Sequence, residues 1–199
     1  MTEKFRNRYR IRSARLQTWD YGRAGAYFIT ICTYQQTHYF GEVVNGRMQL
    51  SAVGILADAF WHEINGHTEN VELGAFSVMP NHVHGILLLN QNDGGDYGDR
   101  RDKACLVSTK TTETATTTTT KTIGQRRFQN QGKNTVSSII GGYKSAVSKD
   151  AHRLGYEFKW QSRFHDHIIR NHESYCRIEK YIITNPQNWP NDKFYDGLP

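Results

Sequence analysis

The chain has 199 residues, a length that suits one domain with or without an inserted segment. Hydrophobic residues make up 37% of it and aromatic residues 12%, which is enough for a packed core. No apolar run approaches the roughly 20 residues of a membrane helix, so we expect no membrane partner. The formal net charge of +6 fits an anionic partner such as nucleic acid, although a basic protein without such a partner has the same balance.

The cysteines and the N-terminus indicate a cytoplasmic protein. Cys32, Cys105 and Cys176 are odd in number and far apart, so neither a disulfide framework nor a cysteine-based zinc site is indicated. Reduced thiols are therefore expected. Residues 1–15 contain no apolar stretch of the kind found in secretory signals. They form a basic arm whose cationic side chains, with Glu3 as the one acid, either bind DNA or lie in solvent: Lys4, Arg6, Arg8, Arg10, Arg12 and Arg15.

The first half of the chain alternates strands with one helix. Residues 27–34 are rich in β-branched and aromatic residues and predict a strand. The Asn45-Gly46 pair predicts a hairpin turn between strands at 39–44 and 47–50. Ser51 can then cap a helix over about 52–64, because apolar residues recur there at helical spacing. Two further strands are expected at 71–78 and 82–89.

The composition changes at about residue 91, where an insert begins. Ten of the sixteen residues from 107 to 122 are threonine, and residues 91–133 offer little to bury. We expect this insert to be poorly ordered. The domain would then consist of residues 16–90 and 134–190.

Regular structure resumes at Thr135, a suitable N-cap for a helix to about residue 154. A strand is expected at 164–170 and a last helix at 173–184, which Pro186 would end. This order of elements predicts an α+β fold in which helices pack on one face of a mainly antiparallel sheet.

The pair His82 and His84 is the sharpest chemical feature. Side chains at i and i+2 of a strand point to the same face, so the two imidazoles can share one cation. A pair of buried histidines that are merely hydrogen-bonded in the core is the competing interpretation. A histidine-triad hydrolase needs a third histidine two residues further on, and Ile86 stands there.

Tyr181 and Asn185 form a second candidate group on the last helix. They share one face because they are four residues apart. A tyrosine hydroxyl can attack a phosphodiester covalently, and an amide one turn away can ligate a metal or orient the phosphate. Tyr143 on the preceding helix is the rival tyrosine. His165 and His167 share one face of the late strand, with Asp166 on the other, and either border the site or are structural.

Three segments together resemble the REP-associated tyrosine transposases, relatives of the single-strand transposases of bacterial insertion sequences. They are MPNHVHGIL (79–87), WQSRFHDHIIR (160–170) and RIEKYIITNPQNW (177–189). The segments 11–33 and 141–145 also resemble this family, in the same order along the chain. The resemblance covers most of the sequence outside the threonine-rich insert, which departs from the family pattern.

The resemblance implies a ferredoxin-like α+β core with the histidine pair, called the HUH motif, on a central strand. His82 and His84 match the metal-binding histidines, and Tyr181 matches the nucleophile that forms a 5′-phosphotyrosine. Asn185 stands where relatives place a polar third ligand, often Gln, so its residue type departs from the family. Tyr143 falls where many relatives carry Phe.

The same resemblance implies a divalent ion, Mg²⁺ or Mn²⁺, and single-stranded DNA hairpins of palindromic repeats as substrate. Arg6, Arg8, Arg10 and Arg12 of the arm, with Lys144 and Arg163, are candidates for DNA binding. Trp160, Trp189 and Phe164 could stack on bases, although core packing is expected for at least two of them. The protein would act as a monomer or a homodimer.

Two other functions stay open at this point. A replication initiator or relaxase is a different HUH nickase, although such enzymes generally carry other surrounding motifs. A DNA-binding relic without catalytic activity would also keep the fold.

Deleting residues 1–15 should weaken binding to all DNA sequences to a similar degree. The logarithm of the binding constant falls linearly with the logarithm of the salt concentration. For every phosphate that the arm no longer neutralises, this slope should become less steep by roughly 0.7 on single strands. Titrations at several salt concentrations measure this slope. A truncated protein that changes only its preference among hairpins would show that the arm reads bases or shape instead.

Overall fold

The computed structural model describes residues 4–5, 8–9, 19–68, 70–90, 135–195 and 197. The insert at 91–133 and the arm residues Arg6, Arg10 and Arg12 lie outside this description, as does the side chain of Arg8. Within the arm, the short strands β1 (Lys4–Phe5) and β2 (Arg8–Tyr9) pair in antiparallel fashion. The predictions for the arm and the insert therefore stay predictions.

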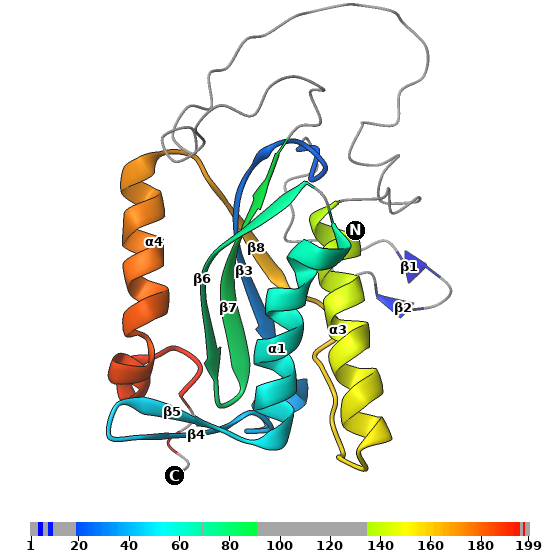
Figure 1. The fold of residues 1–199 in the computed structure, drawn as a ribbon, viewed down its shortest axis with the longest axis vertical. Helices are drawn as coiled ribbons and strands as arrows, with labels where there is room; N and C mark the ends of the chain where they lie inside the picture. The colour runs from blue at the N-terminus through cyan, green and yellow to red at the C-terminus, as the bar shows by residue number, and fades with distance from the viewer. Residues whose placement is uncertain are drawn as a thin grey trace, which may run out of the picture.

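A four-stranded antiparallel sheet forms the centre of the fold (Figure 1). Its strands are β6 (Val71–Met79), β7 (His82–Leu89), β3 (Gly25–Cys32) and β8 (His165–Ile169), in that spatial order. The HUH strand β7 is therefore a central strand, as expected. The α+β fold class is confirmed.

Helices α1 (Ala52–His67) and α3 (Val136–Arg153) cover one face of this sheet. Each begins at a predicted cap, because the side chains of Ser51 and Thr135 accept hydrogen bonds from backbone N–H groups of the first turn. The main core lies under these helices and includes Tyr27, Ile29 and Ile31 of β3. These odd-numbered residues of β3 all point to the α1–α3 face.

Helix α4 (His172–Thr184) lies on the opposite face, which corrects the expectation that all helices pack on one side (Figure 1). Its Ile182 packs in a second core cluster with Ala26, Ile86 and Ile169. Seven of the eight residues of β7 are buried, so both faces of this strand need a cover. The even-numbered face, which carries His82 and His84, is the one that α4 covers.

A small hairpin and two short 3-10 helices lie at the end of the sheet where β7 begins. Strands β4 (Gly41–Val44) and β5 (Arg47–Leu50) pair with each other and are connected by a turn at Asn45 and Gly46. The φ angles of these two residues, 52° and 71°, match the predicted turn. The 3-10 helix η1 spans Tyr34–Gln36. The other, η3 (Pro186–Asn191), follows α4 directly, so Pro186 ends the α-helix as expected.

Within the described residues, no helix is both long and apolar enough to cross a membrane.

Gly85 follows the HUH pair and leaves room for an indole ring that packs close to the backbone there. A Cβ on Gly85 would overlap the six-membered ring of Trp61 on α1. Trp61 is fully buried and stacks on Phe76 with ring centroids 4.5 Å apart. This contact ties α1 to the strand that carries the histidines.

Gly85→Ala should destabilise the protein by about 1–3 kcal/mol, because the core must shift to admit one methyl group. Chemical denaturation measures the free energy of unfolding. Gly66→Ala is the matched control, because a Cβ at Gly66 meets nothing within 4 Å and alanine is the better helix former. Equal stability of Gly85→Ala and the parent would show that the indole is not held against β7.

Candidate metal centre and nucleophile

The two histidines of the HUH motif lie side by side, buried at the start of β7. Their Nε2 atoms are 3.0 Å apart, and less than 2% of either residue is exposed. Both rings face the side of the sheet that α4 covers.

Asn81 fixes which nitrogen of His82 carries the proton. Its Oδ1 lies 2.8 Å from Nδ1 of His82, while its Nδ2 donates to the carbonyl oxygen of Phe194 at 2.9 Å. Because Oδ1 can only accept, Nδ1 of His82 must donate. The neutral ring then presents the lone pair of Nε2 to the site.

Thr30 plays the corresponding part for His84. Its Oγ1 lies 2.9 Å from Nδ1 of His84, and the two residues pair across β3 and β7. Hydrogen bonds of this kind to the remote nitrogen orient histidines that bind metals. If Nδ1 of His84 donates to Thr30, two Nε2 lone pairs face one another, an arrangement that a cation between them stabilises.

Both imidazoles are neutral near pH 7. Burial, followed by the charge of Lys193, lowers the pKa of His82 to about 3. Burial and the neighbouring His82 also lower the pKa of His84 well below its usual range. Metal ligation requires this neutral form, because a protonated nitrogen has no lone pair to share.

Tyr181 reaches the histidine pair from α4. Its hydroxyl donates to Oδ2 of Asp192 at 2.9 Å, and its oxygen lies 3.2 Å from Nε2 of His84. The residue is 38% exposed, so its ring borders the site without being enclosed. Burial and, after it, the hydrogen bond to Asp192 raise the pKa of this phenol.

Asp192 lies just after η3 and accepts hydrogen bonds from both Tyr181 and Asn185. Oδ2 of Asp192 also accepts from Nδ2 of Asn185 at 2.7 Å, and Oδ1 accepts from the backbone N–H of Phe194 at 2.8 Å. Ligand atoms of His82, His84 and Asp192 lie within 4.8 Å of one another. Asn185 is 1% exposed, and its Oδ1 has no hydrogen-bond partner among the residues that the structure describes.

No family model matches the chain. Among curated proteins, an uncharacterized protein of Haemophilus influenzae is 32% identical over 185 residues, which cover 92% of each of the two chains. The chain belongs to the same family as this Haemophilus protein.

Among solved structures, the chain is similar to a REP-associated tyrosine transposase bound to a REP hairpin. The TM-score is 0.55 and the identity 18%, over 95% of this chain and 81% of the other. The chain has the fold of a REP-associated tyrosine transposase. The fold that the sequence motifs implied is therefore confirmed.

The transposase fold brings Tyr181 and Asn185 to the histidine pair, and it keeps the rival Tyr143 away from it. Tyr143 is 3% exposed, and its hydroxyl donates to the carbonyl oxygen of Ala57 in the core between α1 and α3. Burial raises the pKa of Tyr143 well above its usual range. This tyrosine is a core residue on the other face of the sheet.

The candidate DNA-binding and stacking residues have different surroundings. Lys144 donates to the carbonyl oxygen of Gln161 at 2.6 Å, and burial lowers its pKa, whereas Arg163 is exposed. Trp160 and Trp189 are 8% and 5% exposed, so two of the three aromatic candidates pack in the protein as expected. Phe164 is half-buried and packs against the main core.

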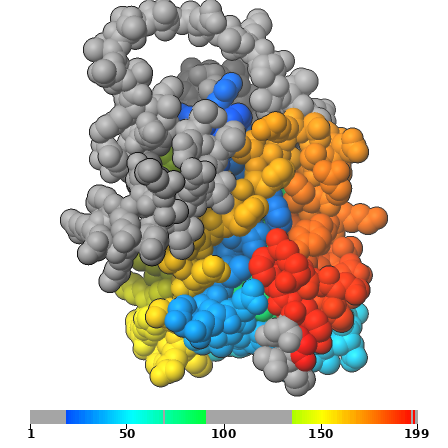
Figure 2. Space-filling model, turned by 180° about the vertical axis from the view of Figure 1, so that it is seen from behind, coloured from blue at the N-terminus to red at the C-terminus, as the bar shows by residue number. Residues whose placement is uncertain are grey.

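His165 and His167 lie on the same face of the sheet as the HUH pair. They pair with Thr30 and Phe28 of β3, and both are exposed. Phe28 also meets Tyr181, with ring centroids 6.2 Å apart. Figure 2 views this side of the molecule, where β3 (blue) is visible between β8 and the C-terminal residues (red). The sheet is therefore open beside Tyr181.

Asp192, Asn81 and Thr30 could not be recognised as site residues from the sequence. Asp192 follows an irregular segment, and its hydrogen bond with Tyr181 and its place near His84 depend on how η3 folds back. The one signal was an acid shortly after the Tyr181 helix.

His82→Ala and Asp192→Ala should each weaken Mn²⁺ binding by about tenfold or more, because each removes one of three clustered ligand atoms. Asn81→Ala should weaken it about 10–100-fold by releasing the ring of His82. The concentration of free Mn²⁺, measured by electron paramagnetic resonance, gives the affinity. His62→Ala is the control, since His62 lies exposed on α1. Unchanged affinity in His82→Ala would contradict a metal site here.

Proposed function

We propose that the protein is a metal-dependent endonuclease and strand transferase that acts on single-stranded DNA through a covalent bond to Tyr181. The observation that carries the proposal is the position of this hydroxyl, 3.2 Å from Nε2 of His84 and 2.9 Å from Asp192. A potential nucleophile thus stands beside a potential metal centre.

The ligand set fits a divalent ion. The Nε2 atoms of His82 and His84 lie 3.0 Å apart, and both lie within 4.8 Å of a carboxylate oxygen of Asp192, so the three groups are close enough to share one ion. His82, His84 and Asp192 would hold the ion, with Oδ1 of Asn185 as a further oxygen ligand. Carboxylate and amide oxygens suit Mn²⁺ or Mg²⁺, and the two imidazole nitrogens favour Mn²⁺ of these two.

A bound divalent ion would polarise the scissile phosphate and offset the charge that develops during cleavage. The orientation of the ligands and of the attacking group can be assigned to the chain. Asn81 and Thr30 keep the imidazoles oriented. Phe28 packs edge-on against the ring of Tyr181 and limits the directions in which it can point.

Cleavage begins with attack of the Tyr181 oxygen on phosphorus. The proton of the phenol passes to Oδ2 of Asp192, which already accepts it as a hydrogen bond. The new bond joins the tyrosine oxygen to phosphorus, and the bond from phosphorus to the 3′ oxygen breaks. The 3′ oxygen takes the bonding electrons and a proton from water. The products are a 5′-phosphotyrosine and a free 3′-hydroxyl.

Strand transfer is the same reaction in reverse with a second strand. A 3′-hydroxyl attacks the phosphotyrosine and gives its proton to water, and Tyr181 leaves with a proton returned from Asp192. No external energy source is needed, because one phosphodiester replaces another.

We propose DNA hairpins with a single-stranded flank as substrates, because the similar transposase is bound to a REP hairpin. The strand would reach Tyr181 over the open part of the sheet at β3 and β8. Arg6, Arg8, Arg10 and Arg12, with Arg163, would supply phosphate contacts. We assign Lys144 a lesser part, since its ammonium group is already bonded to a backbone carbonyl.

Tyr181→Phe should bind hairpin DNA as the parent does but form no covalent adduct, because only the hydroxyl is removed. Tyr143→Phe is the matched control and should keep most of the activity, since its hydroxyl lies in the core. Proteolysis of the protein–DNA complex followed by mass spectrometry identifies the modified peptide. DNA recovered on the peptide of Tyr143, or adduct formation by Tyr181→Phe, would overturn the assignment.

A further inference from the structure

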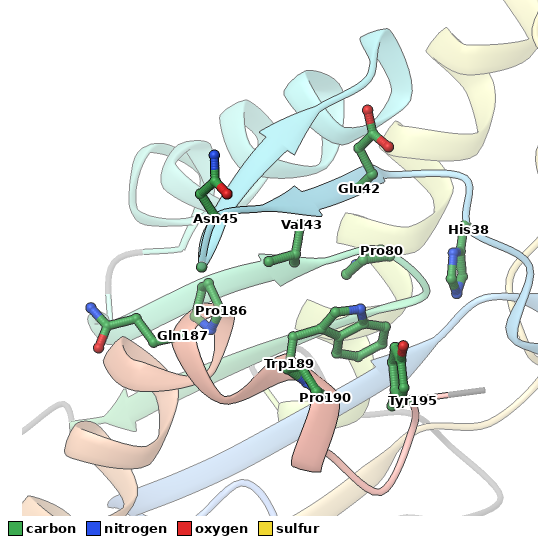
Figure 3. Close-up of a pocket in the computed structure, with 11 residues that line it drawn as sticks. His38, Glu42, Val43, Asn45, Pro80, Pro186, Gln187, Trp189, Pro190 and Tyr195 are labelled. Atoms are coloured by element: carbon green, nitrogen blue, oxygen red, sulfur yellow. The ribbon is translucent and has the colours of Figure 1, made fainter. Parts of the chain in front are cut away.

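A cavity of about 260 Å³ lies between the β4–β5 hairpin and η3 (Figure 3). The indole of Trp189 forms one wall, and Val43 and Pro80 lie across from it. His38 and Tyr195 stand at one end of the indole, and Pro186 lies toward the other. We call this cavity the base pocket.

The base pocket adjoins the candidate metal centre. The ring of Trp189 lies with its centroid 6.0 Å from that of His82, so the indole separates the pocket from the histidine pair. Pro80 comes two residues before His82, and Trp189 lies between Asn185 and Asp192 in the sequence. A ligand in the pocket would therefore be one side chain away from His82.

The walls favour a flat ring. The ring of Tyr195 meets Trp189 nearly at a right angle, 5.4 Å between centroids, and His38 meets it at 6.0 Å. Figure 3 shows the side chains of Glu42, Asn45 and Gln187 pointing outward from the indole. Aromatic and apolar side chains thus surround the indole, and polar side chains contribute about as much of the lining.

The size excludes most other occupants. Pockets for drug-sized ligands measure about 300–1,000 Å³, so this one suits a single small ring system. In single-stranded DNA the bases are free to turn outward, and the ring of Tyr195, which is 38% exposed, offers an aromatic face on which a base can stack.

We propose that the base pocket holds one unstacked nucleobase of the DNA strand next to the scissile phosphate. This inference rests on the proposed function and names the part of the substrate that anchors the strand. Because stacking uses the ring face that every base has, the pocket accepts any base, and it binds a strand that carries a base there more tightly than an abasic one.

The test is an abasic scan of a hairpin DNA taken from inverted repeats beside the gene, with its single-stranded flank. Each flank nucleotide is replaced in turn by an abasic analogue, and affinity is measured by fluorescence anisotropy. At one position the removal of the base should weaken binding about tenfold. Exchange of that base for another should change the affinity less than about threefold.

Val43→Trp should fill the cavity and so remove the sensitivity of binding to the missing base, which means that intact and abasic DNA then bind with equal affinity. Val44→Trp is the control, since Val44 is the next residue of β4 and does not line the cavity. Tyr195→Ala gives a second variant at the exposed end of the pocket, and it should reduce the sensitivity.

Two results would overturn the base pocket: no sensitive position in the parent, or a sensitivity that is unchanged in folded Val43→Trp and Tyr195→Ala. Cleavage of the same DNAs is measured in parallel. Failure to cleave any of them, with the abasic effect present, would refute the proposed reaction and leave the pocket standing. Cleavage without an abasic effect would refute the pocket alone.

Discussion

Two imidazoles whose Nε2 atoms lie 3.0 Å apart can stay inside a protein only if their other nitrogens are satisfied and both rings are neutral. Asn81 and Thr30 meet the first condition, and burial on the central strand β7 meets the second. Asn81 in turn is held by the carbonyl oxygen of Phe194, so the segment after η3 must fold back across the start of β7. The same turn of chain brings Asp192 to the open side of the pair. One requirement for hydrogen bonds thus links the sheet, the turn before β7 and the C-terminal segment.

The alternation of side chains along β7 determines what surrounds the pair. Residues on the odd-numbered face pack under α1 and α3, where Trp61 lies against Gly85, while His82 and His84 point to the other face with Ile86. Helix α4 packs there through Ile182, and this contact sets the position of Tyr181 one residue before it. Tyr181, the proposed nucleophile, therefore reaches the candidate metal centre from a helix, because the packing of α4 positions its ring. The open part of the sheet at β3 and β8 is where we propose that the DNA strand lies.

Local chemistry made much of the fold predictable. The Asn45-Gly46 turn, the caps Ser51 and Thr135, and the HUH pair depend on neighbouring residues and appear where the sequence predicted them. The predicted position of α4 was wrong, because the apolar stripe of a helix does not determine which face of a sheet the helix will cover. Asp192 was missed because no periodicity governs the residues after η3. Its role depends on contacts with Tyr181 and Asn185 that arise only in the folded chain.

The proposed activity requires that His82, His84 and Asp192 hold a divalent ion within reach of the Tyr181 hydroxyl. Crystals of the protein grown with Mn²⁺ would show such an ion in an anomalous difference map measured at the manganese absorption edge. We predict one strong peak between the two Nε2 atoms and the carboxylate of Asp192. A well-ordered site without a peak there, or a peak ligated by other residues, would contradict this assignment.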